Sequence, residues 1–309
     1  MIDGVLAVNK EAGWTSHDIV AKVRQFLGGA KVGHAGTLDP AATGVLPLLI
    51  GKGTRIAEYL VEWDKEYVAQ LRLGQTTDTL DATGTILVTQ PTDQLMPDQI
   101  REAVGRFKGE IQQIPPMYSA VKIGGVPLYR SARAGKTIAR EARTVVIHEL
   151  DVLEIAGDDL TLRVVCSKGT YIRTLAADIG HVLGVGGHLR ALKRTRVGPL
   201  TLDRALTIDE MIDHHKSVHG VSSDIWTLDA VLQNLPAVVI DSRAVDGVCH
   251  GAPVSWSNVV STTNGRGQHA TRQPLRIHDA SGRLLAVGRL SDGSADRIAI
   301  EKVFVTDPV

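Results

Sequence analysis

The chain has 309 residues, which is long enough for one large domain or for two domains of unequal size. Apolar residues make up 43% and charged residues 22%, so the chain can bury a core and is not disordered as a whole. Thirty-four Lys and Arg residues balance thirty-four Asp and Glu residues, which excludes a polybasic protein that coats nucleic acid but leaves room for a local basic patch.

The N-terminal sequence and the cysteines predict a soluble, cytoplasmic protein. No basic region followed by an apolar one is found at the start, so no secretory signal is predicted. No apolar run approaches the roughly 20 residues of a membrane helix, and we expect no membrane contact. Cys166 and Cys249 lack CxxC spacing and predict two reduced thiols rather than a disulfide framework.

The first two-thirds of the chain mixes strands and helices. Alternating apolar residues predict strands, and apolar residues on one helical face, such as Ile19, Val20 and Val23, predict helices. In chain order we expect a strand over 5–8, a helix that Ser16 caps and Gly28-Gly29 ends, a strand over 67–73, a helix over 97–107, a strand over 160–166 and a helix over 171–183. Because strands and helices do not alternate strictly, an α+β fold with an antiparallel or mixed sheet flanked by helices is favoured.

The composition shifts near His214. Residues 214–235 begin as a polar stretch and end in a short helical run before Pro236, and a loop rich in Ser, Thr, Asn and Gly spans about 255–273. Short strands are expected over 237–240, 275–278, 284–290 and 298–305. We therefore expect a first domain over residues 1–225 and a small β-rich domain over residues 236–309.

The segment from Gly33 to Arg55 is the densest in turn-forming residues. Glycines, prolines and threonines surround a single acidic residue, Asp39. Pro40 pushes the preceding backbone toward extended geometry, so this loop can present one carboxylate at the end of a rigid element. An Asp-Pro pair is equally typical of a simple turn, and the pair alone does not separate the two interpretations.

Several common catalytic signatures do not fit. Lys52 is followed by Gly53 rather than by the Ser or Thr of a phosphate loop, and the glycines at 184–187 follow a helix rather than open one. The histidines at 214, 215 and 219 form no HExxH pattern and are expected to be solvated, and no GxSxG nucleophile elbow is found. The sequence therefore indicates neither a nucleotide site nor a metal site.

Residues 33–46, GHAGTLDPAATGVL, resemble the signature of the TruB family of tRNA pseudouridine synthases. Further matches follow in the family's order: KEAGWTS at 10–16, KEY at 65–67, LGQTTDT at 73–79 with Asp81, QIPPMYSAVK at 113–122, CSKGTYIR at 166–173 and LKRT at 192–195. They span about residues 5–200. The C-terminal β-rich part is similar to a PUA RNA-binding domain in position and pattern.

The resemblance implies an isomerase that converts the T-loop uridine of tRNA, conventionally position 55, to pseudouridine. The base is cut from C1′ at N1, turned and rejoined through C5, so no cofactor is needed. By the match, Asp39 is the catalytic carboxylate; whether it attacks C6, attacks C1′ or removes the C2′ proton stays open. Arg173 matches the cation that keeps this carboxylate ionised, since a neighbouring arginine lowers an acid's pKa by about 1–3 units.

The resemblance also implies the surroundings of Asp39. Tyr67 matches a tyrosine that stacks on the target base and is a candidate for proton transfer, while Leu192 matches an apolar wall of the pocket. Lys10 and His34 match residues around the site and the flipped nucleotides, and Asp81 belongs to a matched motif. Without the motifs, Tyr67 would be interpreted as a strand aromatic and His34 as a loop histidine.

Two basic clusters predict where RNA binds. Residues 122–143 hold six Lys or Arg residues and one acidic residue, a net charge of +5, within an insertion at about 115–143 that the family uses as a clamp. The target uridine must be extruded from its folded loop, and local positive charge helps to offset that cost. The RNA-binding candidates are Lys122, Arg130, Arg133, Lys136, Lys168, Lys193 and Arg194.

Three functions are compatible with these residues. The leading one is a stand-alone enzyme on free tRNA, with a monomer as the default state and no obligate protein partner. A non-catalytic RNA-binding or tRNA-folding protein on the same scaffold is the second, and the presence of Asp39, Tyr67 and Arg173 disfavours it. A guide-RNA-dependent enzyme within a ribonucleoprotein is the third; the short C-terminal domain and the lack of long basic tails favour stand-alone action over it.

Overall fold

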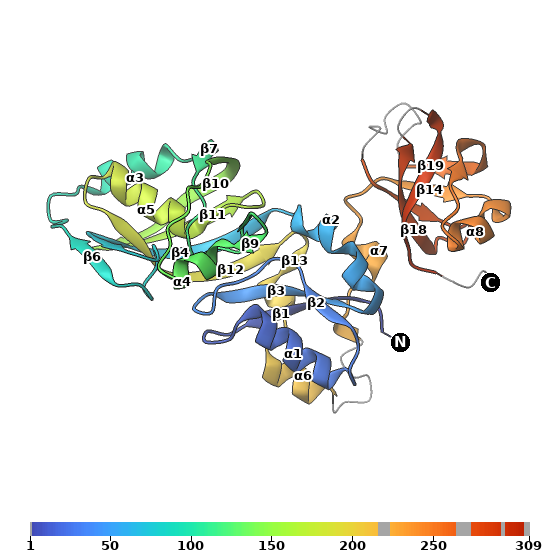
Figure 1. The fold of residues 1–309 in the computed structure, drawn as a ribbon, viewed down its shortest axis with the longest axis horizontal. Helices are drawn as coiled ribbons and strands as arrows, with labels where there is room; N and C mark the ends of the chain where they lie inside the picture. Colours follow the sequence, from blue (N-terminus) through green and yellow to red (C-terminus); the bar gives the residue numbers. More distant parts are fainter. Residues whose placement is uncertain (1, 216–222, 264–272, 292–293, 306–309) are drawn as a thin grey trace.

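A computed structural model describes residues 2–215, 223–263, 273–291 and 294–305 of the chain (Figure 1). Its largest element is a nine-stranded sheet, and the strand order along its main path is β1-β3-β12-β4-β11-β10-β7, with β2 beside β3 and β13 beside β12. The strands are β1 (Gly4–Lys10), β2 (Val32–His34), β3 (Thr43–Ile50), β4 (Lys65–Leu73), β7 (Gly109–Gln113), β10 (Arg143–Ala156), β11 (Asp159–Cys166), β12 (Gly187–Val197) and β13 (Leu200–Thr201). β3 and β12 are parallel and the other pairs are antiparallel, so the expected mixed sheet is confirmed.

Helices pack against both ends of this sheet. The principal ones are α1 (Ser16–Phe26), α3 (Pro97–Gly105), α5 (Ile172–Val182) and α6 (Ile208–His215), and shorter ones are α2 (Ala57–Val61) and α7 (Leu228–Val231). The apolar face of α1 packs with β1 and β3, whereas α3 and α5 cover β4, β10, β11 and β12. The strands and helices expected in this part of the chain are confirmed to within about three residues.

The helix cap at α1 differs from the expected one. Thr15, not Ser16, caps the helix, because the Thr15 side chain accepts a hydrogen bond from the backbone N–H of Asp18. Ser16 is instead buried in the first turn. Its hydroxyl exchanges hydrogen bonds with the backbone N–H and C=O of Leu38, at 2.9 and 3.1 Å, and so ties α1 to the loop between β2 and β3.

A second sheet forms near the C-terminus, in the strand order β15-β19-β18-β17-β14-β16. Its strands are β14 (Ala237–Ile240), β15 (Val254–Ser255), β16 (Val259–Thr262), β17 (Leu275–His278), β18 (Leu284–Ser291) and β19 (Ser294–Val303), and α8 (Ser242–Cys249) packs against it. The sheet curls around its own apolar core and is separate from the larger sheet, as expected for a PUA-like domain (Figure 1).

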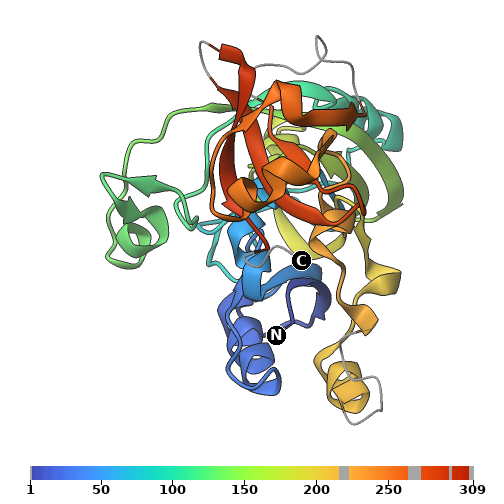
Figure 2. The ribbon, with the colours of Figure 1, turned by 90° about the vertical axis from the view of Figure 1, so that its right-hand side faces the viewer.

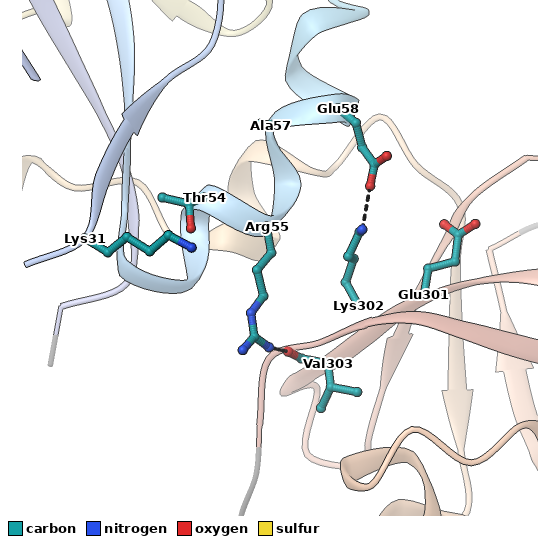
Figure 3. Close-up of a pocket in the computed structure, with 8 residues that line it drawn as sticks. All are labelled: Lys31, Thr54, Arg55, Ala57, Glu58, Glu301, Lys302 and Val303. Carbon is teal, nitrogen blue, oxygen red and sulfur yellow. Dashed lines mark hydrogen bonds and ion pairs between the residues drawn. The ribbon is translucent and has the colours of Figure 1, made fainter. Parts of the chain in front are cut away.

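The two parts of the chain meet at a pocket of about 630 Å³ beside α2 (Figure 3). Arg55 donates a hydrogen bond to the carbonyl of Val303 at 2.7 Å, and Lys302 forms an ion pair with Glu58 at 2.9 Å. Phe304 inserts into the core of the first part of the chain. Its position shows that the end of β19 is packed, rather than loosely tethered, against the larger sheet.

Two further expectations concern the described residues. Cys166 and Cys249 are both buried, and neither forms a disulfide, which confirms that they do not pair. None of the helices in the described ranges is long and apolar enough to span a membrane. Part of the expected loop at 255–273 and of the stretch 214–235 lies outside the described residues.

Candidate active site

The loop between β2 and β3 carries Asp39, and contacts from the N-terminal segment hold it in place. The ammonium of Lys10 donates a hydrogen bond to the carbonyl of Pro40 at 3.2 Å, and the N–H of Gly13 donates to the same oxygen at 2.9 Å. Ser16 fixes Leu38 on the other side of Asp39. Because both neighbours are held, the Asp39 backbone is immobilised while 44% of its side chain stays open to solvent.

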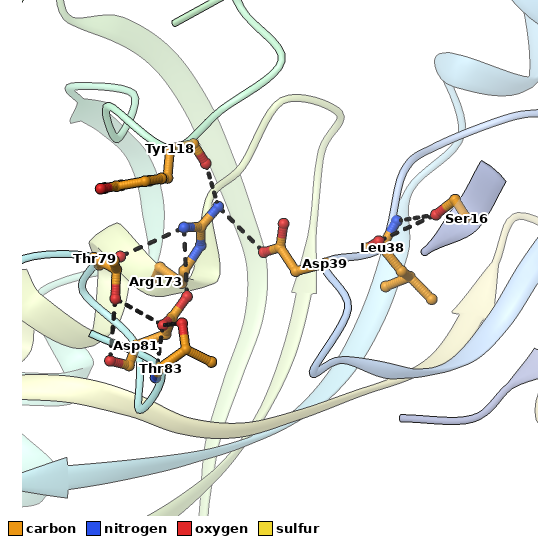
Figure 4. Close-up of polar contacts among 8 residues, drawn as sticks. All are labelled: Ser16, Leu38, Asp39, Thr79, Asp81, Thr83, Tyr118 and Arg173. Carbon is orange, nitrogen blue, oxygen red and sulfur yellow. Dashed lines mark hydrogen bonds and ion pairs between the residues drawn. The ribbon is translucent and has the colours of Figure 1, made fainter. Parts of the chain in front are cut away.

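Arg173 contacts Asp39 from the first turn of α5 (Figure 4). Its Nη2 lies 3.2 Å from Oδ2 of Asp39, which confirms that the two residues expected to pair do so. The same nitrogen donates to the carbonyl of Tyr118 at 2.7 Å, and Nη1 donates to the carbonyl of Thr79 at 3.4 Å. With only 7% of its side chain exposed, Arg173 is a cation held in a fixed position.

Asp81 completes the surroundings of this cation. Its Oδ2 lies 3.5 Å from Nη1 of Arg173, so the guanidinium sits between two carboxylates. The other oxygen of Asp81 accepts hydrogen bonds from the hydroxyls of Thr79 and Thr83, at 2.8 and 2.6 Å, and from the N–H of Thr83 at 3.0 Å. These donors orient Asp81, and Asp81 in turn orients Arg173 toward Asp39.

The pKa of Asp39 shifts in the opposite direction from the expected one. The protein atoms around the carboxylate raise the pKa of Asp39 above its usual range, and Asp81 adds to the rise, while Arg173 and Lys10 oppose it. Arg173 therefore limits the rise and does not reverse it. A ligand bound at the open side of Asp39 would displace the water that remains there. A carboxylate with a raised pKa accepts a proton more readily when it is ionised.

Tyr67 and Leu192 lie on neighbouring strands of the large sheet. Tyr67 occupies β4 with 8% of its surface exposed, and burial raises the pKa of its phenol. Leu192, on β12, is partly buried where the apolar clusters on the two sides of β12 meet. His34, at the end of β2, has a buried Nδ1 with no hydrogen-bond partner among the described residues, and burial lowers the pKa of its imidazole.

One predicted contact to RNA is wrong because the side chain is buried. Arg194 keeps only 2% of its surface exposed and donates hydrogen bonds to the carbonyls of Val45 and Gly36, at 2.7 and 2.9 Å, so it cannot reach a phosphate. Lys10 lies beside the site, as the resemblance implies, and its buried ammonium donates to three carbonyls and thereby supports the Asp39 loop. Burial lowers the pKa of Lys10 to about 8.

The other basic candidates are exposed. The insertion folds into the hairpin of β8 (Lys122–Ile123) and β9 (Val126–Pro127) followed by α4 (Leu128–Arg133), and this segment stands away from the rest of the chain (Figure 2). Lys193 is exposed on β12, and Lys168 is exposed but forms an ion pair with Glu62 at 2.5 Å. The exposed residues of the insertion are Lys122, Arg130, Arg133 and Lys136.

Sequence reasoning missed the residues that position the site. Ser16, Thr79 and Thr83 make its decisive hydrogen bonds, yet a hydroxyl in a loop gives no signal of its partner. Within the described residues, no three His, Cys, Asp or Glu side chains come together as metal ligands. The side chains of the histidines at 214, 215 and 219 lie outside the described part of the chain.

Comparison with known proteins decides the family. The N-terminal domain model of TruB family pseudouridylate synthases matches residues 24–172, and the C-terminal domain model of tRNA pseudouridylate synthase B matches residues 173–239. The chain belongs to the TruB family. It is 43% identical to tRNA pseudouridine synthase B of Burkholderia mallei over 307 residues, which cover 99% of this chain and 98% of the relative. The Ralstonia pickettii protein of the same name is 42% identical, with 94% and 92% covered.

Solved structures of Cbf5 complexes share the fold. The chain superposes on a Cbf5–Nop10–Gar1 complex with a TM-score of 0.78 at 31% identity, covering 99% of this chain and 86% of that one. A chain of an archaeal box H/ACA Nop10–Cbf5 complex gives a TM-score of 0.76 at 29% identity, and the match covers 98% of this chain and 87% of the other. The expected pseudouridine synthase fold is thus confirmed. As a TruB-family enzyme, the chain isomerises uridine to pseudouridine in tRNA.

Proposed function

We propose that the chain acts on the T-loop uridine at position 55 of tRNA and that Asp39 is its catalytic carboxylate. The observation that carries this proposal is the pairing of Asp39 with Arg173, since one side of the carboxylate is held by a cation and the other side is open. Arg173 is itself fixed by the Tyr118 carbonyl and by Asp81. A rigidly held acid with one accessible side suits attack on a single substrate position.

The isomerisation exchanges one glycosidic bond for another. The bond between N1 and C1′ breaks, the base turns, and a bond between C5 and C1′ forms; C5 loses its proton and N1 gains one. Asp39 acts on the ribose or on the pyrimidine as nucleophile or base, which requires its ionised form. Arg173 stabilises that form, and the surrounding protein raises the basicity of the carboxylate.

Other residues receive the flipped base. Tyr67 exposes only 8% of its surface, and its aromatic ring suits stacking on one face of the pyrimidine. Leu192 supplies an apolar wall on the adjacent strand β12, and the imidazole of His34, kept neutral by burial, is available at the end of β2. No cofactor takes part in this scheme, since neither oxidation nor group transfer to a second molecule occurs.

The exposed basic insertion is proposed as the RNA clamp, and residues 236–309 are proposed as a PUA-like RNA-binding domain. If the clamp neutralises phosphates, tRNA affinity falls steeply with salt. We expect a fourfold Gln variant to flatten the slope of log K against log salt by about 3, at roughly 0.7–0.9 per phosphate contact. The substituted residues are Lys122, Arg130, Arg133 and Lys136. An unchanged slope would show that these charges are merely solvated.

The chain is proposed to act in the cytoplasm as a monomer without an obligate protein partner. The near-complete coverage of tRNA pseudouridine synthases B supports action on free tRNA. The solved neighbours are instead subunits of complexes, and one belongs to an H/ACA ribonucleoprotein bound to a substrate RNA. Activity of the purified chain on a bare T-arm hairpin, combined with its mass from light scattering, separates the two modes.

Tritium release tests the chemistry and the carboxylate together. A T-arm hairpin labelled with [5-³H]uridine is incubated with wild type and with Asp39→Asn. We expect release by wild type and none by the variant, with tRNA affinity retained in both. Release by Asp39→Asn at the wild-type rate would eliminate Asp39 as the catalytic carboxylate. Tight binding without release by either protein would favour the RNA-binding or guide-dependent function.

A further inference from the structure

Arg194 is a buried cation that the proposed chemistry does not use. It has the largest of the fully buried side chains, with 2% of its surface exposed. Among the described residues, no carboxylate lies within ion-pair distance of its guanidinium. A buried charge without a counter-ion is costly, and an apolar side chain of similar volume would ordinarily be more stable at such a position. The contacts that Arg194 makes must therefore account for its presence.

Those contacts join the two ends of the Asp39 loop. Nη2 donates to the carbonyl of Gly36, three residues before Asp39, at 2.9 Å. Nε donates to the carbonyl of Val45, at the start of β3, at 2.7 Å. One planar guanidinium thus clamps the loop on both sides of the carboxylate, with two donor nitrogens held at a fixed separation.

The same guanidinium reaches Tyr67. Its charge opposes the rise that burial causes in the pKa of the Tyr67 phenol. In the sheet, Arg194 lies directly opposite Tyr67 on β4 and opposite Gly44 on β3. The side chain therefore lies between the strand that carries the tyrosine and the loop that carries Asp39.

Two glycines with positive φ lie against Arg194, and one of them shows a close approach of the backbone. Gly44 has φ +99°, and a Cβ there would lie 2.1 Å from the carbonyl oxygen of Arg194. Gly36 has φ +93°, and a Cβ there would lie 3.5 Å from Nη1 of Arg194. The backbone of β3 can approach β12 only because position 44 carries no side chain, whereas a Cβ at Gly36 would make an ordinary van der Waals contact with the guanidinium.

We propose that Arg194 is a positioning residue that fixes the Asp39 loop relative to Tyr67. It touches neither the solvent nor the open side of Asp39, so it acts through the residues it holds. The inference rests on the proposed roles of Asp39 and Tyr67. This role explains why a charge without a counter-ion is buried here: it holds the Asp39 loop and the strand that carries Tyr67 in one geometry.

Single-turnover kinetics on the T-arm hairpin test this role with three variants. Arg194→Met removes the charge at similar volume, and Arg194→Lys keeps the charge but loses the double clamp. We expect Arg194→Met to slow the chemical step about 100-fold, as displacement of a catalytic group by about 1 Å does, with RNA affinity changed less than about threefold. Arg194→Lys should recover part of the rate. Leu160→Ala opens a cavity in the core on β11, and should lower stability without slowing the folded enzyme.

A double-mutant cycle with Tyr67→Phe tests the link to the tyrosine. If Arg194 positions Tyr67, Arg194→Met costs less in the Tyr67→Phe background than in wild type. A rate for folded Arg194→Met within about threefold of wild type, or fully independent effects in the cycle, would overturn the proposal. If Arg194→Met does not fold, Arg194→Lys tests the proposal instead, because a wild-type rate in that variant would also overturn it. An active Asp39→Asn variant would overturn the proposed function itself and is measured separately.

Discussion

Replacing Arg173 by Met tests how the site controls its carboxylate. The substitution removes the cation 3.2 Å from Asp39 and leaves the effects of burial and of Asp81 unopposed except by Lys10. The pKa of Asp39 then rises further. Because the ionised carboxylate is the working form, the acid limb of the pH–rate profile moves to higher pH. The ratio of wild-type to variant rate should therefore grow as the pH falls.

The stability cost follows from the contacts that are lost. The hydrogen bond to the Tyr118 carbonyl, at 2.7 Å, is charge-assisted and contributes about 1.5–3 kcal/mol. The contacts at 3.4 and 3.5 Å are weak, and the pair with the half-open Asp39 adds at most about 1 kcal/mol. We expect the free energy of unfolding to fall by about 3 kcal/mol in urea titrations.

Single-turnover rates between about pH 5 and pH 9 provide the assay, with Arg173→Lys as the control that keeps the charge. The lysine variant should retain most of the wild-type position of the acid limb. A ratio of rates that does not change with pH, or an acid limb that moves to lower pH in Arg173→Met, would refute the electrostatic role given to Arg173. A stability loss in Arg173→Met without any change in the profile would leave it a purely structural residue.

Two further predictions concern the backbone and the buried lysine. Gly44→Ala must separate β3 from β12 and strain a left-handed residue, so we expect it to lower stability by at least about 1–3 kcal/mol and to slow the reaction. Gly105→Ala, at the end of α3 where nothing lies within 4 Å, is the matched control and should be neutral or stabilising; equal losses in both variants would contradict the strand-approach argument. Burial lowers the pKa of Lys10 from 10.5 to about 8, so the unfolded chain binds its proton more tightly and the folded state gains stability as pH rises through that window. Urea unfolding of wild type and Lys10→Met should therefore show wild type gaining relative stability from about pH 8 to about pH 10.5, and a constant difference would contradict the assignment.

Local structure could be predicted where it depends on neighbours in sequence. The four apolar residues 237–240 form β14 within the expected bounds, and the apolar face of Ile19, Val20 and Val23 forms the buried side of α1. Thr15 and Ser16 are both suited to cap that helix. Ser16 is used otherwise because Leu38, 22 residues away, offers it two backbone partners.

Lys193 and Arg194 illustrate the limit of a charge pattern. Both are basic and adjacent, and both were predicted to bind RNA. On a strand, consecutive side chains point to opposite faces, so one of the two had to turn inward. Lys193 is exposed and Arg194 is buried, an outcome that depends on which face of β12 meets β3 and β4. The polarity of the two residues does not indicate which of them faces inward.

The sequence by itself determined the family, the mixed fold and the residues that gather around Asp39, because the motifs preserve residue types and their order along the chain. The tertiary structure alone decided how those residues act. It placed Arg173 against an acid 134 positions earlier, enclosed Asp81 in threonine hydroxyls and made burial outweigh Arg173 in the pKa of Asp39. Desolvation and charge pairing are set by distances between segments remote in sequence, and these distances exist only once the sheet has formed.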